Sequence, residues 1–546
     1  MIFITILELL SIGIVIPFVS GLFNSNNQIE IVFFDFININ QLNFINIMFL
    51  FALIYLIKTF ALIYFQKLKF FKIFGIQKYL SHIVLNNYLK LPTENLIKIN
   101  TSEITRNVLN EVHLFIKSYL VNILDFILEL FIVISLVSFL VIYNPIISLS
   151  LLGPTLATGI LIYFLSKNKI LEIGIKRQKF TKLTFQSITE IFSSIIEIKI
   201  YKKEIISNQI FNNLNHSKLD SEQKQSYYLT IPRIILELVV VIFILFIVLV
   251  NLNKTSSEEL ITILALLGVT SIKIFPAINK IVTTFQRLKF VDPAVKLIKK
   301  EVEDYQNNRM KIVSQDISNK KIIENWNSIE IKNLDFAYDK KKIFNNLNLK
   351  IKRGDKICLL GESGEGKTTL LNLIMMLLKT EKEYLYIDNK IIKSNLFYEI
   401  ASYLPQDIYL FDASIKDNIT FMDSENSFNK KRFEYSIKIA LLEQLISEQP
   451  NKENEIVAEF GMRFSGGQKQ RIGIARSIYQ SRELLIFDES TSQLDQVTEE
   501  KLVDNLISTN KTIIFITHKK HLQKKFNRTL LLKEKNIVEL NNEKKN

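Results

Sequence analysis

Cysteine, glycine and proline are all scarce in this sequence. Its 546 residues include one cysteine, Cys358, so an intrachain disulfide framework is excluded. The low counts of 15 glycines and 9 prolines exclude collagen-like and low-complexity chains. Hydrophobic residues make up 48%, which excludes intrinsic disorder because disordered chains have few apolar residues. A chain of this length exceeds what one core usually organises, so two or more domains are expected.

Acidic residues are outnumbered by basic ones. Lys and Arg number 68 against 54 Asp and Glu, giving a net charge of +14. Two classes of protein carry such an excess: nucleic-acid-binding proteins, and membrane proteins with basic cytoplasmic loops. The mean hydropathy of +0.19 leaves too little polar surface for a purely soluble chain, and therefore favours the membrane.

Long apolar runs are confined to the first part of the chain. A transmembrane helix needs about 20 mostly apolar residues, and we identify six candidate spans: Ile2–Phe23, Leu42–Phe65, Tyr119–Tyr143, Ile146–Phe164, Thr230–Leu252 and Leu260–Phe285. The first lacks the basic start and the small-residue cleavage site of a signal peptide, so we interpret it as a span. We expect a membrane domain at 1–300, a linker at 301–327 and a second domain at 328–546.

Basic residues gather in two of the segments between these runs, 66–118 and 167–229, whereas 24–41 and 144–145 have none. Cytoplasmic loops are the ones that keep lysine and arginine, so both termini are expected in the cytoplasm. Both basic segments are helical in pattern but too polar to span. We therefore predict that transmembrane helices 2 to 5 continue into the cytoplasm as helical extensions.

The run KICLLGESGEGKTTLLNLIM is typical of a strand, a glycine turn and a helix. It fits the pattern G-x-x-x-x-G-K-[ST] through Gly361, Gly366, Lys367 and Thr368. Glycines let backbone N–H groups close on phosphate oxygens, and the following helix presents its N-terminus to the same anion. Lys367 is predicted to reach the β- and γ-phosphates, and Thr368 to bind Mg²⁺. Glu365 is an acid inside this anion-binding turn, so we expect its side chain to point away from the phosphates.

Two acids end a second apolar strand, in the run ELLIFDES at Glu483–Ser490. Ligands bind at the carboxyl edge of strands in open α/β sheets. Asp488 suits the surroundings of Mg²⁺, and Glu489 suits the general base on an attacking water. The alternative is an acidic pair without function at a strand end, which is common in α/β folds.

A second anion site is predicted from the run RFSGGQKQRIGIARSI. Ser465, Gly466 and Gly467 precede an amphipathic helix and offer a hydroxyl and free backbone N–H groups at its N-terminus. One nucleotide does not need two such sites so far apart in sequence. A head-to-tail dimer does, because the second site of each chain then closes over the nucleotide of the other.

The tetrapeptide Ser465-Gly466-Gly467-Gln468 resembles the signature of ATP-binding-cassette (ABC) proteins, and six spans followed by one nucleotide-binding domain resemble a half-size ABC exporter. The resemblance implies an all-α six-helix transmembrane domain of ABC exporter type, followed by an α/β P-loop nucleotide-binding domain. It also implies ATP and Mg²⁺ as cofactors and a homodimer of two half-transporters. A heterodimer with a degenerate partner stays open.

The same resemblance gives roles to single residues. Tyr338 matches the aromatic that stacks on adenine, and Asp495 matches the D-loop aspartate. ATP binding is then expected from Tyr338 and from Gly361, Glu362, Ser363, Gly364, Glu365, Gly366, Lys367, Thr368 and Thr369. Contacts to the ATP of the partner are expected from Ser465, Gly466, Gly467 and Gln468. Mg²⁺, partly through water, is expected at Thr368, Gln406 and Asp488. Catalysis is expected from Glu489, His518 and Gln406, where Gln406 matches the Q-loop glutamine and His518 the switch histidine.

Charged residues inside the candidate spans are costly and usually line cavities. The basic ones, Lys58, Arg233, Lys273 and Lys280, indicate a basic substrate cavity suited to an anionic headgroup. The alternatives are an internal pair between Arg233 and Glu237 at i, i+4, and snorkelling of Lys58 or Lys280 to an interface. Glu129 is the remaining charged candidate.

A narrower resemblance links IPRIILELV, IKIFPAINKIVTTFQ, GESGEGKTTLLNLI and LPQDIYLFDASIKDNITF to the bacterial flippase for lipid-linked oligosaccharides of protein N-glycosylation. It implies an ATPase that moves a polyprenyl-diphosphate-linked oligosaccharide, or another amphipathic glycolipid, across the bacterial inner membrane. The alternatives are a multidrug, lipid or peptide exporter, and an ABC-fold protein that gates or regulates. Six spans exclude a soluble DNA-associated ABC ATPase, so no nucleic-acid partner is expected.

Overall fold

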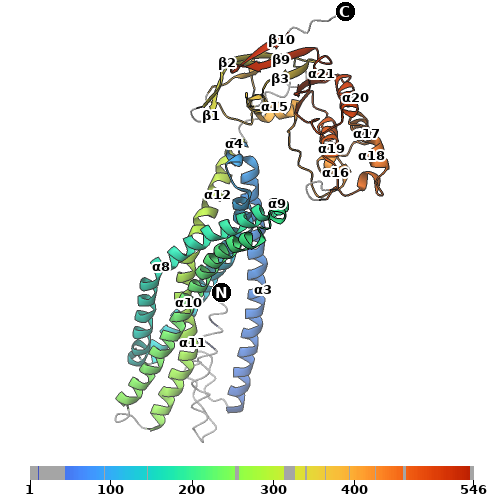
Figure 1. The fold of residues 1–546 in the computed structure, drawn as a ribbon. Helices are drawn as coiled ribbons and strands as arrows, with labels where there is room; N and C mark the ends of the chain where they lie inside the picture. Colours follow the sequence, from blue (N-terminus) through green and yellow to red (C-terminus); the bar gives the residue numbers. More distant parts are fainter. Residues whose placement is uncertain are drawn as a thin grey trace, which may run out of the picture. The chain divides into compact units, whose positions relative to one another are not determined.

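The computed structural model divides into two compact units, Met1–Leu91 with Leu96–Lys311 and Pro92–Asn95 with Ile312–Asn546. The structure describes residues 44–91, 93–143, 145–251, 257–312, 326–338, 341–362, 364–380, 382–392, 394–424, 426–458 and 463–540, with the single positions 6 and 10. The N-terminal unit is helical and the C-terminal unit is built on sheets (Figure 1).

Three very long helices dominate the N-terminal unit. They are α3 (Phe44–Lys90), α8 (Pro145–Ser193) and α10 (Glu204–Asn251), of 47, 49 and 48 residues. Each is more than twice the length of about 20 residues needed to cross a membrane. Each apolar run therefore continues without a break into its polar neighbour, as the predicted helical extensions require (Figure 1).

Short helices interrupt the two basic segments. They are α4 (Thr93–Ile97) and α9 (Ile195–Ile200). After α4 the chain runs as one helix with two π-helical stretches, through α5 (Thr101–Thr105), η2 (Arg106–Glu111), α6 (Val112–Leu114), η3 (Phe115–Leu120) and α7 (Val121–Tyr143). The unit ends with α11 (Ser257–Phe290) and α12 (Asp292–Ile312), so a helix continues through position 301, where we placed the start of the linker.

Among the described residues, three helices are long and apolar enough to cross a membrane: Met48–Lys90, Thr101–Ser135 and Glu204–Phe246. They overlap the second, third and fifth candidate spans. The fourth and sixth lie in α8 and α11, where many side chains are outside the described residues, and Ile2–Phe23 lies almost wholly outside them.

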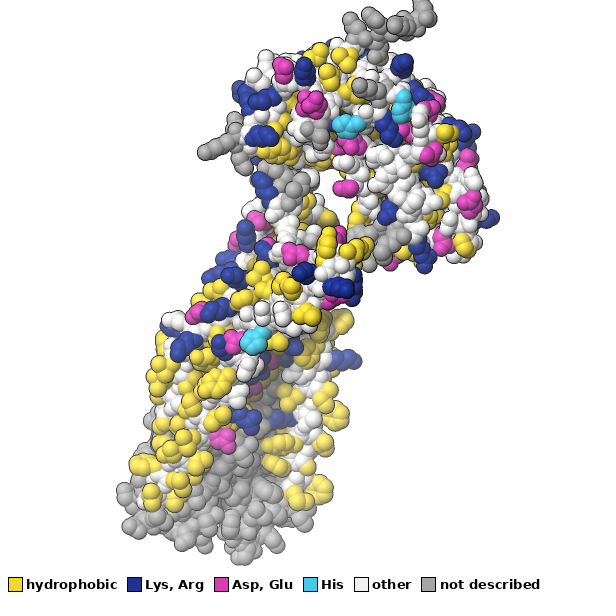
Figure 2. Space-filling view, in the orientation of Figure 1, with side chains coloured by type: hydrophobic (Ala, Val, Ile, Leu, Met, Phe, Trp, Pro, Cys, Tyr) yellow, Lys and Arg dark blue, Asp and Glu magenta, His cyan; other side chains and the backbone are white. Residues whose placement is uncertain are grey.

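Large apolar side chains cover the outside of this unit. Phe60 and Phe71 on α3 and Leu165 on α8 are at least 70% exposed, and Figure 2 shows hydrophobic side chains along these helices. Such a surface is stable against lipid, because the apolar side chains are not exposed to water there and the helical backbone satisfies its own polar groups. Inside the unit, Gly174 of α8 lets the helices approach closely, since a Cβ there would lie 2.1 Å from the carbonyl oxygen of Phe290 at the end of α11.

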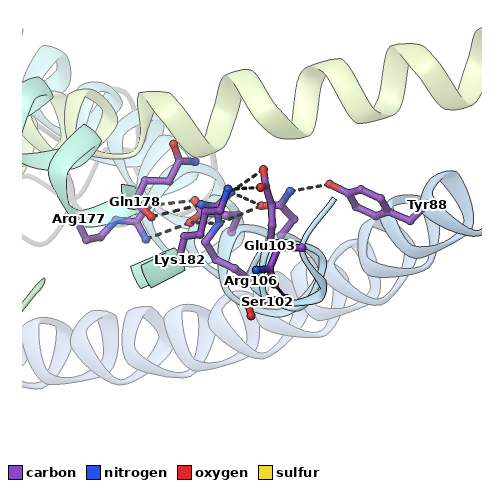
Figure 3. A network of polar contacts seen from close by, with 10 residues as sticks. Tyr88, Ser102, Glu103, Arg106, Arg177, Gln178 and Lys182 are labelled. Atoms are coloured by element: carbon purple, nitrogen blue, oxygen red, sulfur yellow. Dashed lines mark hydrogen bonds and ion pairs between the residues drawn. The ribbon is translucent and has the colours of Figure 1, made fainter. Parts of the chain in front are cut away.

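A polar network joins α8 to the helical run that follows α4 (Figure 3). The Arg177 guanidinium of α8 donates to both oxygens of Glu111 in η2, at 3.3 and 3.0 Å. Arg106 donates to the carbonyl of Gln178 at 3.4 Å, and Lys182 pairs with Glu103. Glu111 is fully buried. A buried carboxylate is tolerated only with charged partners, and here two arginines supply them.

The C-terminal unit contains two sheets. A four-stranded antiparallel sheet has the order β2-β1-β4-β5, and a six-stranded sheet has the order β10-β9-β3-β8-β7-β6. The second is parallel apart from the β10–β9 hairpin. Its central strands β7 (Leu484–Asp488) and β8 (Thr512–Ile516) are buried along their whole length, which explains their continuous apolar sequences.

The remaining elements follow in chain order. The strands are β1 (Ser328–Tyr338), β2 (Lys341–Lys352), β3 (Lys356–Leu360), β4 (Leu385–Ile387), β5 (Lys390–Ile391), β6 (Ala401–Leu404), β9 (Arg528–Lys533) and β10 (Asn536–Leu540). The helices are α14 (Lys367–Ile374), α15 (Ser394–Ile400), α16 (Ile415–Thr420), α17 (Lys430–Ile439), α18 (Glu443–Ser447), η4 (Lys452–Asn454), α19 (Gly466–Tyr479), α20 (Gln496–Ile507) and α21 (Lys520–Gln523).

Candidate nucleotide site

The glycine turn joins β3 to α14, as the sequence predicts. Lys367 opens α14 and its ammonium donates to the carbonyls of Gly361 and Glu362, at 2.9 and 2.8 Å. Gly366 has φ +103°, and a Cβ there would lie 2.8 Å from the side chain of Ile343. The positive φ and the close side chain both favour glycine at this position of the turn.

Glu365 folds back onto the same turn. Its Oε2 accepts a hydrogen bond from the backbone N–H of Glu362 at 2.8 Å. The side chain also lines a pocket of about 530 Å³ together with Gly361, Glu362 and His518. The carboxylate therefore lies inside the turn and accepts from one of its N–H groups, so our expectation that it points away from the phosphate-binding turn is wrong for this structure.

Three predicted catalytic residues meet beyond the carboxyl ends of neighbouring parallel strands. Gln406 follows β6, Glu489 follows β7 and His518 follows β8. The carboxylate of Glu489 lies 2.9 Å from Nε2 of His518 through one oxygen, and accepts from Nε2 of Gln406 at 3.2 Å through the other. Glu489 has φ +47°, a conformation that non-glycine residues rarely adopt and that often marks a functional site.

Asp488 lies beside this cluster and is almost completely buried. Burial raises the pKa of its carboxyl, while hydrogen bonds with Thr368 and Tyr403 act in the opposite direction. The Tyr403 hydroxyl donates to Oδ2 at 3.3 Å. Thr368 and Asp488 together offer the hard oxygen atoms that Mg²⁺ prefers. These side chains therefore fit the magnesium ion that the sequence predicts.

The residues of the second predicted anion site begin α19. Ser465 is the N-cap, and it forms a capping box with Gln468: its hydroxyl accepts from the backbone N–H of Gln468 at 3.3 Å, and its own N–H donates to Oε1 of Gln468 at 2.8 Å. Asp495 caps α20 in the same way, accepting from the N–H of Thr498 at 2.9 Å. These side chains have local structural roles in addition to the predicted contacts.

Close packing explains why two glycines stand after Ser465. A Cβ on Gly466 would lie 1.5 Å from the side-chain oxygen of Gln493, and one on Gly467 would lie 3.0 Å from the Gln493 carbonyl oxygen. The turn that ends at Asp495 thus lies directly against the start of α19. The predicted signature and D-loop segments form one surface of the C-terminal unit.

Comparison with known proteins identifies this unit. The family model described as ABC transporter matches residues 344–492, which include the glycine turn, Gln406, Ser465 and Glu489. Residues 344–492 of the C-terminal unit therefore match an ABC transporter domain.

Curated relatives are similar over part of the chain. ABC transporter B family member 29, chloroplastic, of Arabidopsis thaliana is 28% identical over 65% of this chain and 56% of that protein. The leukotoxin translocation ATP-binding protein LktB of Mannheimia glucosida is 36% identical over 39% and 30%. The ATP-dependent lipid A-core flippase of Wigglesworthia glossinidia brevipalpis is 34% identical over 42% and 40%. The chain thus spans about half, or less, of the length of these curated relatives.

A solved structure extends the likeness to nearly the whole chain. The structure of a bacterial Atm1-family ABC exporter with ATP bound matches with a TM-score of 0.72 and 19% identity, over 90% of this chain and 87% of that chain. The predicted fold class is confirmed: a helical transmembrane domain precedes the ABC transporter domain. Together with the three membrane-length helices among the described residues, this fold indicates a multi-pass membrane protein.

Four other residues were predicted to bind ATP. Tyr338 ends β1, is 45% exposed and packs edge-on against Phe336 at 5.0 Å between ring centroids. Thr369 lies in the first turn of α14. Gly364 has φ +86° in the glycine turn, and Ser363 lies outside the described residues.

The charged residues of the membrane spans are arranged differently from our expectation. Lys280 of α11 pairs with Asp125 of α7 at 3.5 Å, and Lys69 of α3 pairs with the other oxygen of Asp125 at 2.7 Å. Lys58 is buried, with its ammonium over the ring of Tyr55. Sequence analysis missed Asp125, although it lies inside a candidate span like Glu129, and Lys69, which lies just beyond one.

The other two basic candidates do not join this cluster in the described part of the chain. Arg233 and Glu237 are both exposed on α10. The salt bridges of the described residues do not include a pair between them, so the i, i+4 alternative is not supported. The side chain of Lys273 lies outside the described residues.

Proposed function

We propose that the chain is an ATP-driven exporter or flippase that hydrolyses ATP at the cluster of Gln406, Glu489 and His518. The observation that carries the proposal is the position of Glu489, whose two carboxylate oxygens contact His518 and Gln406. A carboxylate held by a histidine and an amide at the carboxyl edge of a parallel sheet suits a general base for an attacking water.

Different groups of the chain have different roles in the proposed hydrolysis. Lys367 balances the charge of the β- and γ-phosphates, and backbone N–H groups of the glycine turn hold the phosphate oxygens. Glu489 accepts the proton of the attacking water, and His518 and Gln406 orient its carboxylate. Thr368 and Asp488 hold Mg²⁺, which when bound neutralises charge on the phosphates.

We propose that two copies of the chain form the working transporter. Ser465 is exposed at the start of α19, where the first backbone N–H groups of a 14-residue helix favour an anion. In a head-to-tail dimer, Ser465, Gly466, Gly467 and Gln468 of one protomer meet the ATP of the other. The short helices α4 and α9 are the proposed places where this closure is passed to the membrane helices, because they interrupt the two cytoplasmic extensions.

The proposed substrate is an amphipathic lipid with an anionic headgroup, in particular a polyprenyl-diphosphate-linked oligosaccharide. Lys69 and Lys280 share one acid, Asp125, so this single carboxylate does not neutralise both ammonium groups. A diphosphate accepts charge-assisted hydrogen bonds from such ammonium groups. The apolar outer surface suits the lipid tail, and the bacterial inner membrane, with both termini in the cytoplasm, is the proposed location.

A second candidate is export of a peptide or a drug, because a leukotoxin translocation protein is among the relatives. The ATPase activity of the full chain in proteoliposomes distinguishes the two. We expect a polyprenyl-diphosphate oligosaccharide to stimulate hydrolysis, and the uncharged polyprenol to have no effect.

The variant Lys69→Gln/Lys280→Gln extends this experiment. Each lost charge-assisted hydrogen bond removes about 1.5–3 kcal/mol, so the ratio of stimulated to basal hydrolysis should fall towards one. Lys224→Gln, in an exposed pair with Asp220 on the polar part of α10, is the matched control and should keep the ratio. Equal stimulation by polyprenol would exclude the anionic headgroup, whereas stimulation by peptides alone would establish the second candidate.

A further inference from the structure

A second carboxylate lies close to the catalytic cluster without touching it. Glu499 is in the first turn of α20 and has no exposed surface. One of its oxygens accepts from the Thr491 hydroxyl at 2.7 Å, and the other accepts from the Lys519 ammonium at 2.8 Å. His521 also faces it, with Nε2 at 3.7 Å, and lies 3.8 Å from Glu500.

The partners of Glu499 are neighbours of the catalytic residues in sequence. Thr491 follows Glu489 by two positions, in the turn closed by a backbone hydrogen bond from Ser492 to Glu489. Lys519 directly follows His518, and its backbone N–H is held by the Thr517 hydroxyl at 3.1 Å. One buried carboxylate therefore joins the two turns that carry the catalytic base and the histidine.

Burying an acid is costly, and an apolar side chain of similar size would usually stabilise the fold at least as well. A charged residue is useful at such a position when it determines geometry. The geometry that Glu499 could determine is the 2.9 Å contact between Glu489 and His518. Both turns contact Glu499, and among the described residues this Glu489–His518 contact is the one ion pair between the turns themselves.

We propose that Glu499 is a positioning residue that sets the separation of Glu489 and His518. This inference rests on the proposed ATPase function. Glu499 holds the Glu489 turn through Thr491 and the His518 turn through Lys519. Loss of either contact lets the two turns move apart, so that the base and the histidine no longer share one water.

The test uses the full-length chain in lipid nanodiscs and measures kcat and KM for MgATP. Loss of a residue that orients catalytic groups typically costs about 10–100-fold in activity. We expect Glu499→Gln and Lys519→Gln each to lower kcat by such a factor with KM little changed, and Lys519→Arg to keep kcat, because a guanidinium also donates to Glu499. Lys519 is one-third exposed, so its replacement should not prevent folding.

Asp504→Asn is the matched control. Asp504 is also an acid of α20 and accepts from Lys525 at 2.7 Å, but it is 61% exposed and is not joined to the turns of Glu489 and His518. We expect a kcat close to that of the unmodified chain. Melting temperatures of all variants establish whether any loss of activity follows stability instead.

Combination with His518→Ala separates positioning from general damage. If Glu499 acts through the contact of His518 with Glu489, then Glu499→Gln should add little to the loss in a His518→Ala background, measured in single turnovers. Multiplication of the two losses, or a rise in KM with unchanged kcat, would overturn the inference. If His518→Ala and Glu489→Gln themselves leave kcat unchanged, the proposed function is wrong instead.

Discussion

Asp488 and Glu489 are adjacent carboxylates in different surroundings. Asp488 is 2% exposed at the end of β7, and burial raises its pKa. The Glu489 side chain is 23% exposed and contacts two polar side chains. The apolar strand and its two acids were predictable from the sequence. The contact of Glu489 with Gln406 was not, because it depends on the parallel pairing of β6 with β7.

Asp488→Asn should change the stability of the nucleotide-free protein and its stabilisation by MgATP in different ways. The raised pKa means that the folded state binds this proton more tightly than the unfolded chain, in which an aspartate has its ordinary pKa of 3.8. Stability contributed by Asp488 is therefore lost as the pH rises through the unfolded and then the folded pKa, and at neutral pH its charge destabilises the empty domain.

The asparagine has no such charge. We expect a melting temperature of the nucleotide-free protein equal to or above that of the unmodified chain, and loss of the further rise that MgATP produces. Thermal denaturation with and without MgATP measures both quantities. A full MgATP shift in the variant would remove Asp488 from the magnesium site.

Substitutions at the start of α19 should lower the stability of the protein to different degrees. Ser465→Ala removes an N-cap, which costs about 1 kcal/mol of stability. Gly467→Ala brings a Cβ to 3.0 Å from a backbone oxygen, whereas the Gly466 clash is with the movable end of a side chain. We expect Gly467→Ala to lower the melting temperature more than Gly466→Ala. The reverse order would show that Gln493 cannot move.

At the scale of elements, the long helices were predictable because apolar runs continue into helical polar segments. The π-helical stretches η2 and η3 were not, since nothing in RNVLNE or FIKSYL differs from an ordinary helix. The structure associates η2 with tertiary contacts: Glu111 and Arg106 are buried and hydrogen-bonded to Arg177 and Gln178 of α8. Asp125 was likewise missed because its lysine partners lie on two other helices.

The contact between η2 and α8 can be tested with one substitution and a close control. Glu111→Gln leaves Arg177 buried without its charged partner, which typically costs about 3–5 kcal/mol. Glu172→Gln breaks an exposed i, i+4 pair with Lys176 on the same α8, and exposed pairs of this kind contribute little to stability.

We expect the melting temperature of the detergent-solubilised protein to fall clearly for Glu111→Gln and hardly at all for Glu172→Gln. Equal small shifts in the two variants would mean that the buried network contributes no more than a surface pair.

At the scale of the whole molecule, the order of parts was predictable: apolar spans first, then the glycine turn, signature and strand-end acids. The substrate was harder to predict, because its recognition is expected to depend on a few charged side chains in the membrane helices. Of the four basic cavity residues predicted, Lys280 has an acidic partner that sequence analysis missed, and Arg233 is exposed on α10. Spacing along one helix does not reveal which other helix will face it.

The proposed function requires that ATP hydrolysis at Glu489 drives a lipid across the membrane. The direct measurement is ATP-dependent movement of a fluorescent polyprenyl-diphosphate oligosaccharide between the leaflets of proteoliposomes containing the full chain. We predict movement with the unmodified chain, and none above background with Glu489→Gln, which should still bind ATP while hydrolysis falls by about 10²–10⁴-fold. Equal movement by both proteins in ATP, or equal movement with and without ATP, would contradict the account.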